Sequence, residues 1–466
     1  MSQNIVRINK ITLVNFKNVK NGTVDMPSTS NKDVFSRRAD ILGIYGQNGS
    51  GKTSIIEAIR FAQLLISGEE LPADTKDYIS KDESECEIDI QFSISEDEQN
   101  EIASYHVAFQ RQDDTFLISH ERLAITPRKD SGRAAESVLI DYHFDNGDTV
   151  FTPDYRFKKL VANNKKIRID LKVAQAISIK SHQSFIFGKE GFSIFSQCKK
   201  DVMGEFGQIF SILQKYAFVN LFVISNEHSG PISMNLLLPV AFYLSDGKQI
   251  TTGDLPIRID APSVITKRML SIAQSIIDNM NIVLKNVIPG MQIEIHNFGE
   301  QLLENGEVGY KIELLSHRND ILIPLKYESE GIIKIVSFLD VLICVYNNPS
   351  MCLAIDELDS GVFEFLLGEL LAIFSNGGKG QLIFTSHNLR ALEMLDKKSV
   401  MFSTTNPHNR YIRLQNVQAN NNIRDLYLRC LTIGGQKEEM YDATDSVAIG
   451  RAFRRAGKAV DSRGEN

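Results

Sequence analysis

The segment Gly46–Thr53 constrains this chain more than any other feature of its sequence. It reads G-Q-N-G-S-G-K-T and fits the pattern G-x-x-x-x-G-K-[ST]. The apolar run Ile41–Tyr45 before it predicts a strand, and Ser54–Leu65 after it predicts a helix. Glycines let backbone N–H groups turn toward phosphate oxygens, and the start of a helix adds partial positive charge. The segment therefore predicts a phosphate-binding loop at the end of a buried strand.

The side chains of this loop have separate expected roles. Lys52 is expected to reach the β- and γ-phosphates of ATP, and the Thr53 hydroxyl is expected to ligate Mg²⁺. The residues expected to contact the nucleotide are Gly46, Asn48, Gly49, Ser50, Gly51, Lys52, Thr53 and Ser54.

An acidic pair, Asp356-Glu357, follows a second apolar run, Met351–Ile355. A run this apolar suits a central parallel strand, and the carboxyl ends of parallel strands meet at one edge of a sheet. We therefore expect Asp356 to lie beside the loop and to help hold Mg²⁺. Glu357 is expected to act as the general base toward an attacking water, which favours hydrolysis over passive binding.

The order of expected elements indicates an α/β fold. Residues 1–165 alternate apolar and polar positions and predict a β-rich lobe, whereas strands and helices alternate after residue 291. The segment between them carries helical spacing, most clearly at Val264–Ile288, which Pro289-Gly290 ends. The expected parts are an N-terminal ATPase lobe (1–165), a compact helical insertion (166–290), a C-terminal ATPase lobe (291–420) and a helical basic tail (421–466).

Composition excludes some classes of protein. The 466 residues include 51 Lys plus Arg and 58 Asp plus Glu, so the formal net charge is −7. This charge excludes a wholly basic nucleic-acid coat, although it leaves room for a local basic patch. The five cysteines are scattered without a C-x-x-C pair, which favours a reduced, cytoplasmic protein. The apolar runs are too short to cross a membrane, and no secretory signal is expected.

Together with Asp359 and Thr385-Ser386-His387, these motifs resemble the ABC-type ATPase heads of SMC, RecF and overcoming-lysogenisation-defect proteins. The opening segment Ile11–Asn18 is similar to the first strand of those heads. The resemblance implies an ABC-ATPase head, in which a β-rich lobe joins a parallel-sheet core. It also implies that Asp359 lies at a dimer interface and that His387 senses the γ-phosphate, which adds His387 to the catalytic residues Lys52 and Glu357.

In that family a signature segment reaches across a dimer to the γ-phosphate in the partner head. The matching segment here is Tyr327–Gly331, Y-E-S-E-G, which keeps Ser329 and Gly331 but has Glu330 in place of the first glycine. The resemblance implies a head-to-tail dimer in which Ser329 and Gly331 complete the ATP site of the other copy. Gln183 is the best position for the glutamine loop of the family, with a plain loop glutamine as the alternative.

The interval between residues 165 and 325 is too short for the long coiled-coil arm of SMC proteins. The sequence therefore most resembles the short AAA ATPases of antiphage systems, such as the AriA ATPase of PARIS and the AbiL-type abortive-infection ATPases. This implies a regulatory ATPase that oligomerises around ATP and controls a separate effector, such as a nuclease. The alternatives are a RecF/SMC-like repair or chromosome-maintenance ATPase that clamps DNA, and a transporter subunit, which Glu330 disfavours.

A second catalytic centre has one weak candidate. Asp154 after Pro153, followed by Asp170 and Lys172, mimics the carboxylate and lysine pattern of a metal-dependent nuclease. The stretch between these residues is rich in arginine and lysine, so it also fits a solvated strand pair or a contact with nucleic acid.

Overall fold

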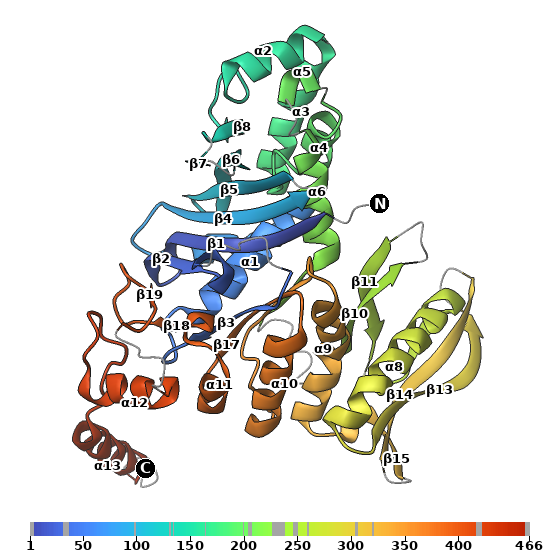
Figure 1. Cartoon of the computed structure of the whole chain (residues 1–466), viewed down its shortest axis with the longest axis vertical. Coiled ribbons are helices and arrows are strands. Elements are labelled where there is room, and N and C mark those ends of the chain that lie inside the picture. Colours follow the sequence, from blue (N-terminus) through green and yellow to red (C-terminus); the bar gives the residue numbers. More distant parts are fainter. Residues whose placement is uncertain are drawn as a thin grey trace.

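The computed structural model describes residues 4–30, 37–96, 99–129, 132–133, 135–163, 165–198, 200–203, 207–225, 238–245, 250–258, 261–302, 306–318, 321–415 and 422–461. An antiparallel sheet and a parallel sheet lie on either side of helix α1 (Lys52–Ser67) (Figure 1). This arrangement confirms the predicted α/β class, with a β-rich N-terminal lobe joined to a parallel core.

The antiparallel sheet forms most of the N-terminal lobe. Its strands run in the order β2-β1-β4-β5-β6-β7, and β8 also pairs with β6. Alternate side chains of β4, such as Ile88, Ile90 and Phe92, are buried against the core that α1 shares. The bounds are β1 (Ile5–Phe16), β2 (Val19–Asp25), β4 (Glu85–Glu96), β5 (Gln99–Gln112), β6 (Thr115–Lys129), β7 (Gly132–Arg133) and β8 (Ser137–His143).

The parallel sheet has the order β19-β18-β3-β17-β16-β9, and β19 alone runs antiparallel to its neighbour in the described part of this sheet. Every residue of β3, β16 and β17 is buried, as expected for central strands that are covered on both faces. The bounds are β3 (Asp40–Tyr45), β9 (Leu221–Ile224), β16 (Cys352–Ile355), β17 (Gln381–Ser386), β18 (Val400–Ser403) and β19 (Tyr411–Ile412).

Helices cover the second face of the parallel sheet. Figure 1 shows α9 (Glu330–Asn347), α10 (Glu364–Gly377) and α11 (Leu389–Met394) below it, on the side opposite α1. Their apolar residues form a second core with the sheet, which includes Phe338, Leu371 and Phe384. The central strands of the core are therefore shielded from water on both faces, which leaves their ends as the part that can bind a ligand.

The segment 166–290 is not helical throughout, which corrects the expected helical insertion. Its helices α3 (Lys165–Ser181), α4 (Lys189–Phe195), α5 (Lys200–Met203) and α6 (Ile209–Lys215), and a π-helical turn at Tyr216–Asn220, lead into β9. Strand β9 pairs in parallel with β16 and belongs to the core sheet. A run of four apolar residues fits a strand or a helix equally well, and the sheet partner that decides between them lies 131 positions away, at Cys352 opposite Leu221.

The rest of that segment contributes to a smaller α/β layer. A hairpin of β10 (Leu238–Ser245) and β11 (Ile250–Ile257) precedes β12 (Ser263–Thr266) and the long helix α8 (Lys267–Val287), which confirms the predicted helix. Helix α8 packs on the sheet formed by β12, β13 (Met291–Leu302), β14 (Val308–Arg318) and β15 (Ile321–Pro324). The side chain of Thr266 caps α8 by accepting a hydrogen bond from the Met269 N–H.

The predicted nuclease-like residues lie on helices, which corrects the expected strand pair. Asp154 begins α2 (Asp154–Asn163), where it forms an ion pair with Lys158, and Lys172 lies on α3. The Lys172 ammonium donates to the Gly147 carbonyl. Asp154 thus lies on one helix and Asp170 and Lys172 on the next, so the expected strand pair with its metal site is absent from these described helices.

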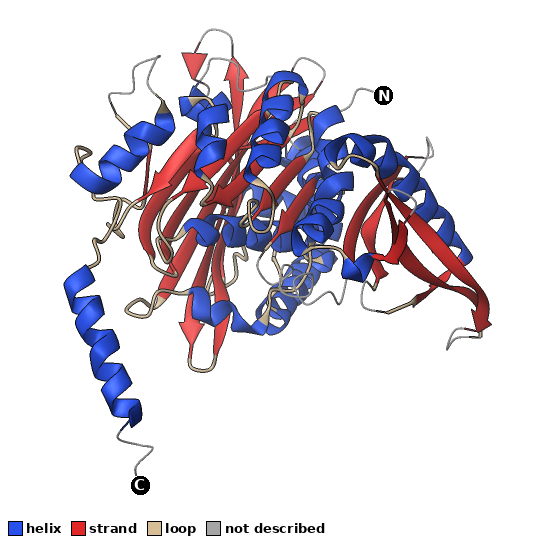
Figure 2. Cartoon of the chain, turned by 90° about the horizontal axis from the view of Figure 1, so that it is seen from below, coloured by secondary structure: helices blue, strands red, loops and turns tan. Residues whose placement is uncertain are grey.

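Two helices follow the core, α12 (Ile423–Ile433) and α13 (Ser446–Asp461), as predicted for the tail. Helix α13 projects away from the body of the molecule (Figure 2). Within the described residues, no helix combines the length and the apolar character needed to cross a membrane.

Candidate functional site

The predicted motifs meet at the carboxyl edge of the parallel sheet. Strand β3 leads into the glycine-rich loop, β16 is followed by Asp356, and β17 leads into His387. Because these strands are parallel, their carboxyl ends share one edge, which is where open α/β sheets bind their ligands.

Glycine geometry shapes the loop Gly46–Thr53. Gly51 has a φ of 86° and immediately precedes α1, and Gly46 has a φ of 154°. A side chain on Gly46 would place its Cβ 1.9 Å from the Ser403 hydroxyl oxygen. Both positions therefore need glycine, one for its left-handed conformation and the other for a close approach.

The Lys52 ammonium folds back over this loop. It is buried and donates to the carbonyl oxygens of Gly46, at 2.9 Å, and Gln47, at 2.8 Å. Burial lowers the pKa of Lys52, while the charges of Asp356 and Glu357 oppose that shift. The lysine is thus held inside the loop, in the position that the sequence predicts for a phosphate-binding cation.

The last two strands of the sheet support the loop from the side. The Ser50 hydroxyl donates to the Gln47 carbonyl at 2.7 Å and also bonds the Ser403 hydroxyl at the end of β18. The Tyr411 hydroxyl, on β19, donates to the Gly51 carbonyl. The loop is therefore preorganised by contacts with residues more than 350 positions away in sequence.

Asp356 is fully buried and receives two hydroxyl groups. Thr53 Oγ1 lies 3.0 Å from Asp356 Oδ2, and the Thr385 hydroxyl donates to Asp356 Oδ1. The Thr385 oxygen also accepts the Glu357 N–H at 2.8 Å. One network thus joins the loop, the acidic pair and the end of β17. Because a threonine hydroxyl and a carboxylate are hard oxygen donors, Thr53 and Asp356 fit Mg²⁺.

Glu357 turns away from the strand with a φ of 50° and is half-buried. The Lys334 ammonium, on α9, donates to the Glu357 carbonyl. Burial lowers the pKa of Lys334, and the carboxylates of Asp359, Glu357 and Asp356 oppose the shift. Sequence reasoning missed Lys334, because only the packing of α9 against the sheet brings it to the acidic pair.

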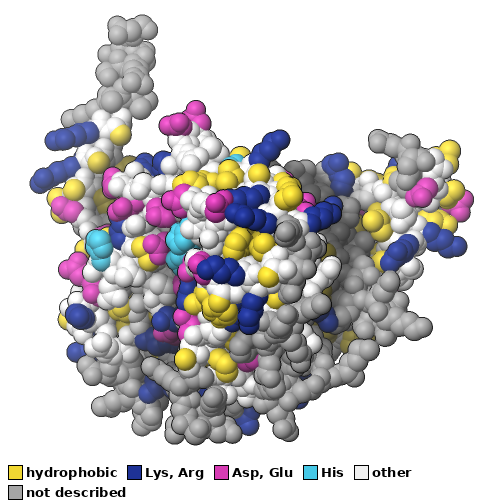
Figure 3. Space-filling view, turned by 90° about the horizontal axis from the view of Figure 1, so that it is seen from above, with side chains coloured by type: hydrophobic (Ala, Val, Ile, Leu, Met, Phe, Trp, Pro, Cys, Tyr) yellow, Lys and Arg dark blue, Asp and Glu magenta, His cyan; other side chains and the backbone are white. Residues whose placement is uncertain are grey.

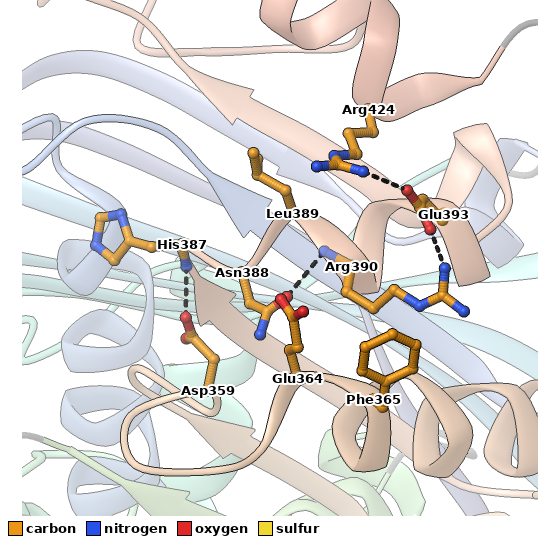
Figure 4. A pocket seen from close by; sticks show the side chains of 9 residues that line it. All are labelled: Asp359, Glu364, Phe365, His387, Asn388, Leu389, Arg390, Glu393 and Arg424. Carbon is orange, nitrogen blue, oxygen red and sulfur yellow. Dashed lines mark hydrogen bonds and ion pairs between the residues drawn. The ribbon is translucent and has the colours of Figure 1, made fainter.

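Asp359 and His387 lie at one end of a pocket of 420 Å³, where the His387 N–H donates to Asp359 Oδ2 at 3.0 Å (Figure 4). Desolvation lowers the pKa of His387, and the Lys52 ammonium lowers it further. Glu393 binds two guanidinium groups in the other part of the pocket, those of Arg390 and Arg424. The structure thus places His387 beside the loop that carries Asp359, a contact that the sequence did not indicate.

The signature segment caps a helix in this structure. The Ser329 hydroxyl accepts the Ile332 N–H at 3.4 Å and begins α9, and its side chain is exposed. Gly331 is buried against the turn after Asp359, because a Cβ there would lie 1.8 Å from the Gly361 carbonyl oxygen. Gly331 thus has a packing role within its own chain, while Ser329 is open to a partner.

Gln183 does not lie at this edge, so of the two alternatives it is a plain loop glutamine and not part of a glutamine loop. Its side chain lies 3.4 Å from Glu70, beyond the C-terminal end of α1, whereas the phosphate loop precedes the other end. Helix α1 has 16 residues and is roughly 24 Å long. The strand that does end beside Asp356 is β9, since the Asp356 N–H donates to the Ile224 carbonyl at 2.9 Å. Buried Ser225 follows it, and residues 226–237 lie outside the described residues.

The C-terminal segment also contacts the loop. The Asp442 N–H donates to the Gln47 side-chain oxygen at 2.9 Å, and the Gln47 amide lies 3.4 Å from the Asp442 carboxylate. No sequence pattern indicates this contact, because its partners are 395 positions apart.

These features agree with the comparisons to known proteins. A family model described as "AAA domain" matches residues 10–249, which is more than half of the chain and includes the phosphate loop. The chain therefore belongs to this AAA-domain family. No curated protein sequence matches the chain.

Solved structures of SMC heads are similar to the chain over most of its length. An SMC head bound to the C-winged helix domain of ScpA is 14% identical, with a TM-score of 0.42 over 87% of this chain and 98% of the other. The SMC head domain from Thermotoga maritima is 14% identical, with a TM-score of 0.34 over 88% and 99%. An SMC head with an extended coiled coil, from Pyrococcus furiosus, is 13% identical, with a TM-score of 0.38 over 88% and 96%. At these identities and scores the similarity concerns the fold alone.

Proposed function

We propose that this chain is an ATPase whose catalytic site is completed by a second copy of the chain. The observation that carries the proposal is the network in which Asp356 accepts hydroxyl groups from Thr53 and Thr385, beside a buried lysine in a glycine-rich loop. An isolated phosphate loop would suit many nucleotide-binding proteins. The acidic pair at the next strand end supplies a metal ligand and a base as well, which favours hydrolysis.

Each residue has a defined part in the proposed reaction. Lys52 and the loop N–H groups bind the phosphates, and Thr53 and Asp356 hold Mg²⁺, which neutralises phosphate charge when bound. Glu357 accepts the proton of the attacking water. His387, whose pKa is lowered by desolvation and by the Lys52 ammonium, supplies a ring nitrogen near Lys52, and Asp359 accepts the backbone N–H of that histidine.

The exposed start of α9 supports a head-to-tail dimer. Ser329 caps this 18-residue helix at its positive end, where an anion is favoured, and its side chain is accessible to a partner. We propose that ATP holds two heads together because the Ser329 end of one head completes the γ-phosphate site of the other. Hydrolysis removes that contact, so dimerisation reports the nucleotide state.

The proposed biological role is that of a regulatory ATPase in an antiphage, abortive-infection system, where the dimer or a higher oligomer controls a separate effector such as a nuclease. Two points support this role. The chain resembles the short defence ATPases in its degenerate signature, where Glu330 replaces a glycine, and in the short interval between residues 165 and 325. The candidate nuclease residues of this chain lie on helices α2 and α3, which suits an ATPase that controls a separate effector.

A specific observation favours a second candidate, a DNA clamp. Figure 3 shows lysine and arginine side chains among exposed apolar ones on the face that lies at the top of Figure 1, where α2 and α3 are found. Lys158, Lys166 and Arg168 are exposed on these helices. Arg156 is buried instead and donates to the carbonyls of Val138 and Val202, so it is unable to contact a duplex.

The test compares Glu357→Gln with the wild type for ATP turnover and for mass in solution. We expect the variant to lose at least about 100-fold in turnover and to accumulate as an ATP-bound dimer, because binding is kept while the base is lost. Glu369→Gln, an exposed carboxylate on α10, is the matched control and should behave as wild type. Wild-type turnover in Glu357→Gln would show that the general base is another group.

A native purification with Mg-ATP separates the two biological roles. A stoichiometric co-purifying effector would support the regulatory ATPase. Duplex DNA bound in an ATP- and salt-dependent way, without such a partner, would favour the clamp.

A further inference from the structure

Two histidines and an aspartate converge on the outward face of the antiparallel sheet. His120 on β6 and His143 on β8 are direct cross-strand partners. Asp141 precedes His143 by two residues, so both project from the same face of β8. Their candidate ligand atoms all lie within 4.8 Å of one another. Within the part of the chain that the structure describes, no other group of three such residues is as close together.

Both imidazole rings are directed at one carboxylate oxygen. His120 Nε2 lies 2.7 Å and His143 Nε2 3.6 Å from Asp141 Oδ1, and the two rings are stacked with centroids 3.9 Å apart. A transition-metal ion bound by nitrogen and carboxylate ligands needs distances of about 2.0–2.2 Å. Small side-chain rotations would place three donors around one centre, because the strands already fix their Cα positions.

The neighbouring charges leave these donors available to a metal ion. Arg122 directs its Nη2 to Glu136, and its Nε is 4.0 Å from Asp141 Oδ2, on the oxygen that the histidines do not contact. Burial lowers the pKa of His120, the rings of His143 and His106 lower it further, and Asp141 opposes the shift.

A further pair lies behind the three donors. The His106 ring on β5 is centred 4.8 Å from the His120 ring, and its Nδ1 is 3.7 Å from Asp89. These residues form a second layer that restricts the orientation of His120, as the outer partners of metal-binding histidines commonly do.

We propose that His120, Asp141 and His143 bind one divalent transition-metal ion, with zinc as the first candidate. Two imidazole nitrogens and one carboxylate suit zinc better than Mg²⁺ or Ca²⁺, which prefer oxygen ligands. The three side chains are 22%, 27% and 46% exposed, in the order His120, Asp141 and His143, so a fourth coordination position faces solvent. The ion would fasten β8 to β6, and this site is separate from the nucleotide site.

The test is an equilibrium measurement of zinc binding by the untagged full-length protein, with Co²⁺ absorption as a second probe of the ligands. We expect the wild type to bind one equivalent of zinc at this site, and His143→Ala to bind that equivalent at least about 100-fold more weakly. Asp141→Asn is the second variant and should lose the same equivalent. Thermal melting of each variant verifies that it is folded.

The matched control is His317→Ala. His317 Nδ1 lies 3.0 Å from Glu294 across two strands, so this pair has the same chemistry without a third ligand. We expect His317→Ala to bind as much zinc as the wild type. Equal zinc stoichiometry in the wild type and His143→Ala would overturn the proposal. So would a wild type that binds no zinc when zinc and protein are mixed at a 1:1 ratio.

Discussion

The phosphate loop and the signature segment differ in how much of their environment the chain itself supplies. Lys52 is buried and its loop is bonded to β18 and β19, whereas Ser329 is exposed at the start of α9. The phosphate-loop half of the site is thus complete within one copy of the chain. The signature half is held rigidly by the Gly331–Gly361 contact but points to solvent. This difference is what we expect of a site that two copies share.

Lys52→Ala tests the phosphate-loop half of the site and should have the largest effect on nucleotide binding. We expect nucleotide binding to be lost, because no other described cation lies inside the loop. Binding of a fluorescent ATP analogue measures this loss, with Lys215→Ala, an exposed position on α6, as the control. Unchanged affinity in Lys52→Ala would mean that the loop is not the phosphate site.

Gly331→Ala tests the rigidity of the signature half. The new Cβ would lie 1.8 Å from a backbone carbonyl oxygen, so α9 must shift away from the turn after Asp359. We expect a loss of about 1–3 kcal/mol in the free energy of unfolding, measured by denaturant titration, together with weaker ATP-dependent dimerisation. Gly147→Ala, where a Cβ meets nothing within 4 Å, is the control. Full stability in Gly331→Ala would show that this close packing does not constrain α9.

Thr385→Val tests the bond network between β17 and the acidic pair. Valine keeps the shape of threonine but leaves the Glu357 N–H and Asp356 Oδ1 without their hydroxyl partner. We expect a cost of about 1–3 kcal/mol in stability and a marked fall in ATP turnover. Thr432→Val, an exposed position on α12, is the control. Turnover equal to wild type would place Thr385 outside the working site.

His387→Gln tests a smaller, pH-dependent effect. Desolvation and Lys52 lower the pKa of His387, so the folded chain binds fewer protons there than the unfolded chain. Stability from this group is complete above the ordinary pKa near 6.5 and decreases as the pH falls through the lower folded value. We expect the melting temperature of the wild type to fall more than that of His387→Gln between about pH 7 and pH 5. Parallel melting curves at both pH values would contradict this shift.

The sequence predicted those parts of the site that are local in the chain. The loop Gly46–Thr53 and the pair Asp356-Glu357 each depend on a strand and its next few residues, and both lie where they were expected. Strand β9, Lys334 and the Gln47–Asp442 contact depend instead on packing between distant segments. A short apolar run does not reveal which sheet it joins, and a lysine one turn into α9 has no pattern of its own. The helix content of the segment 166–290 was predicted too high for the same reason, because its short apolar runs form strands through pairing with distant segments.

The central claim, that two copies share each ATP site, is tested most directly by mixing two inactive variants. Lys52→Ala lacks a working loop but keeps its signature, and Ser329→Asp keeps the cap of α9 while its charge repels phosphate. In a head-to-tail dimer of one copy of each, a single site is intact. An equal mixture should therefore recover ATP turnover, up to about half of the wild-type value, because ATP joins only the mixed dimer and one of its two sites is intact. Turnover no greater than that of the separate variants would contradict the shared site.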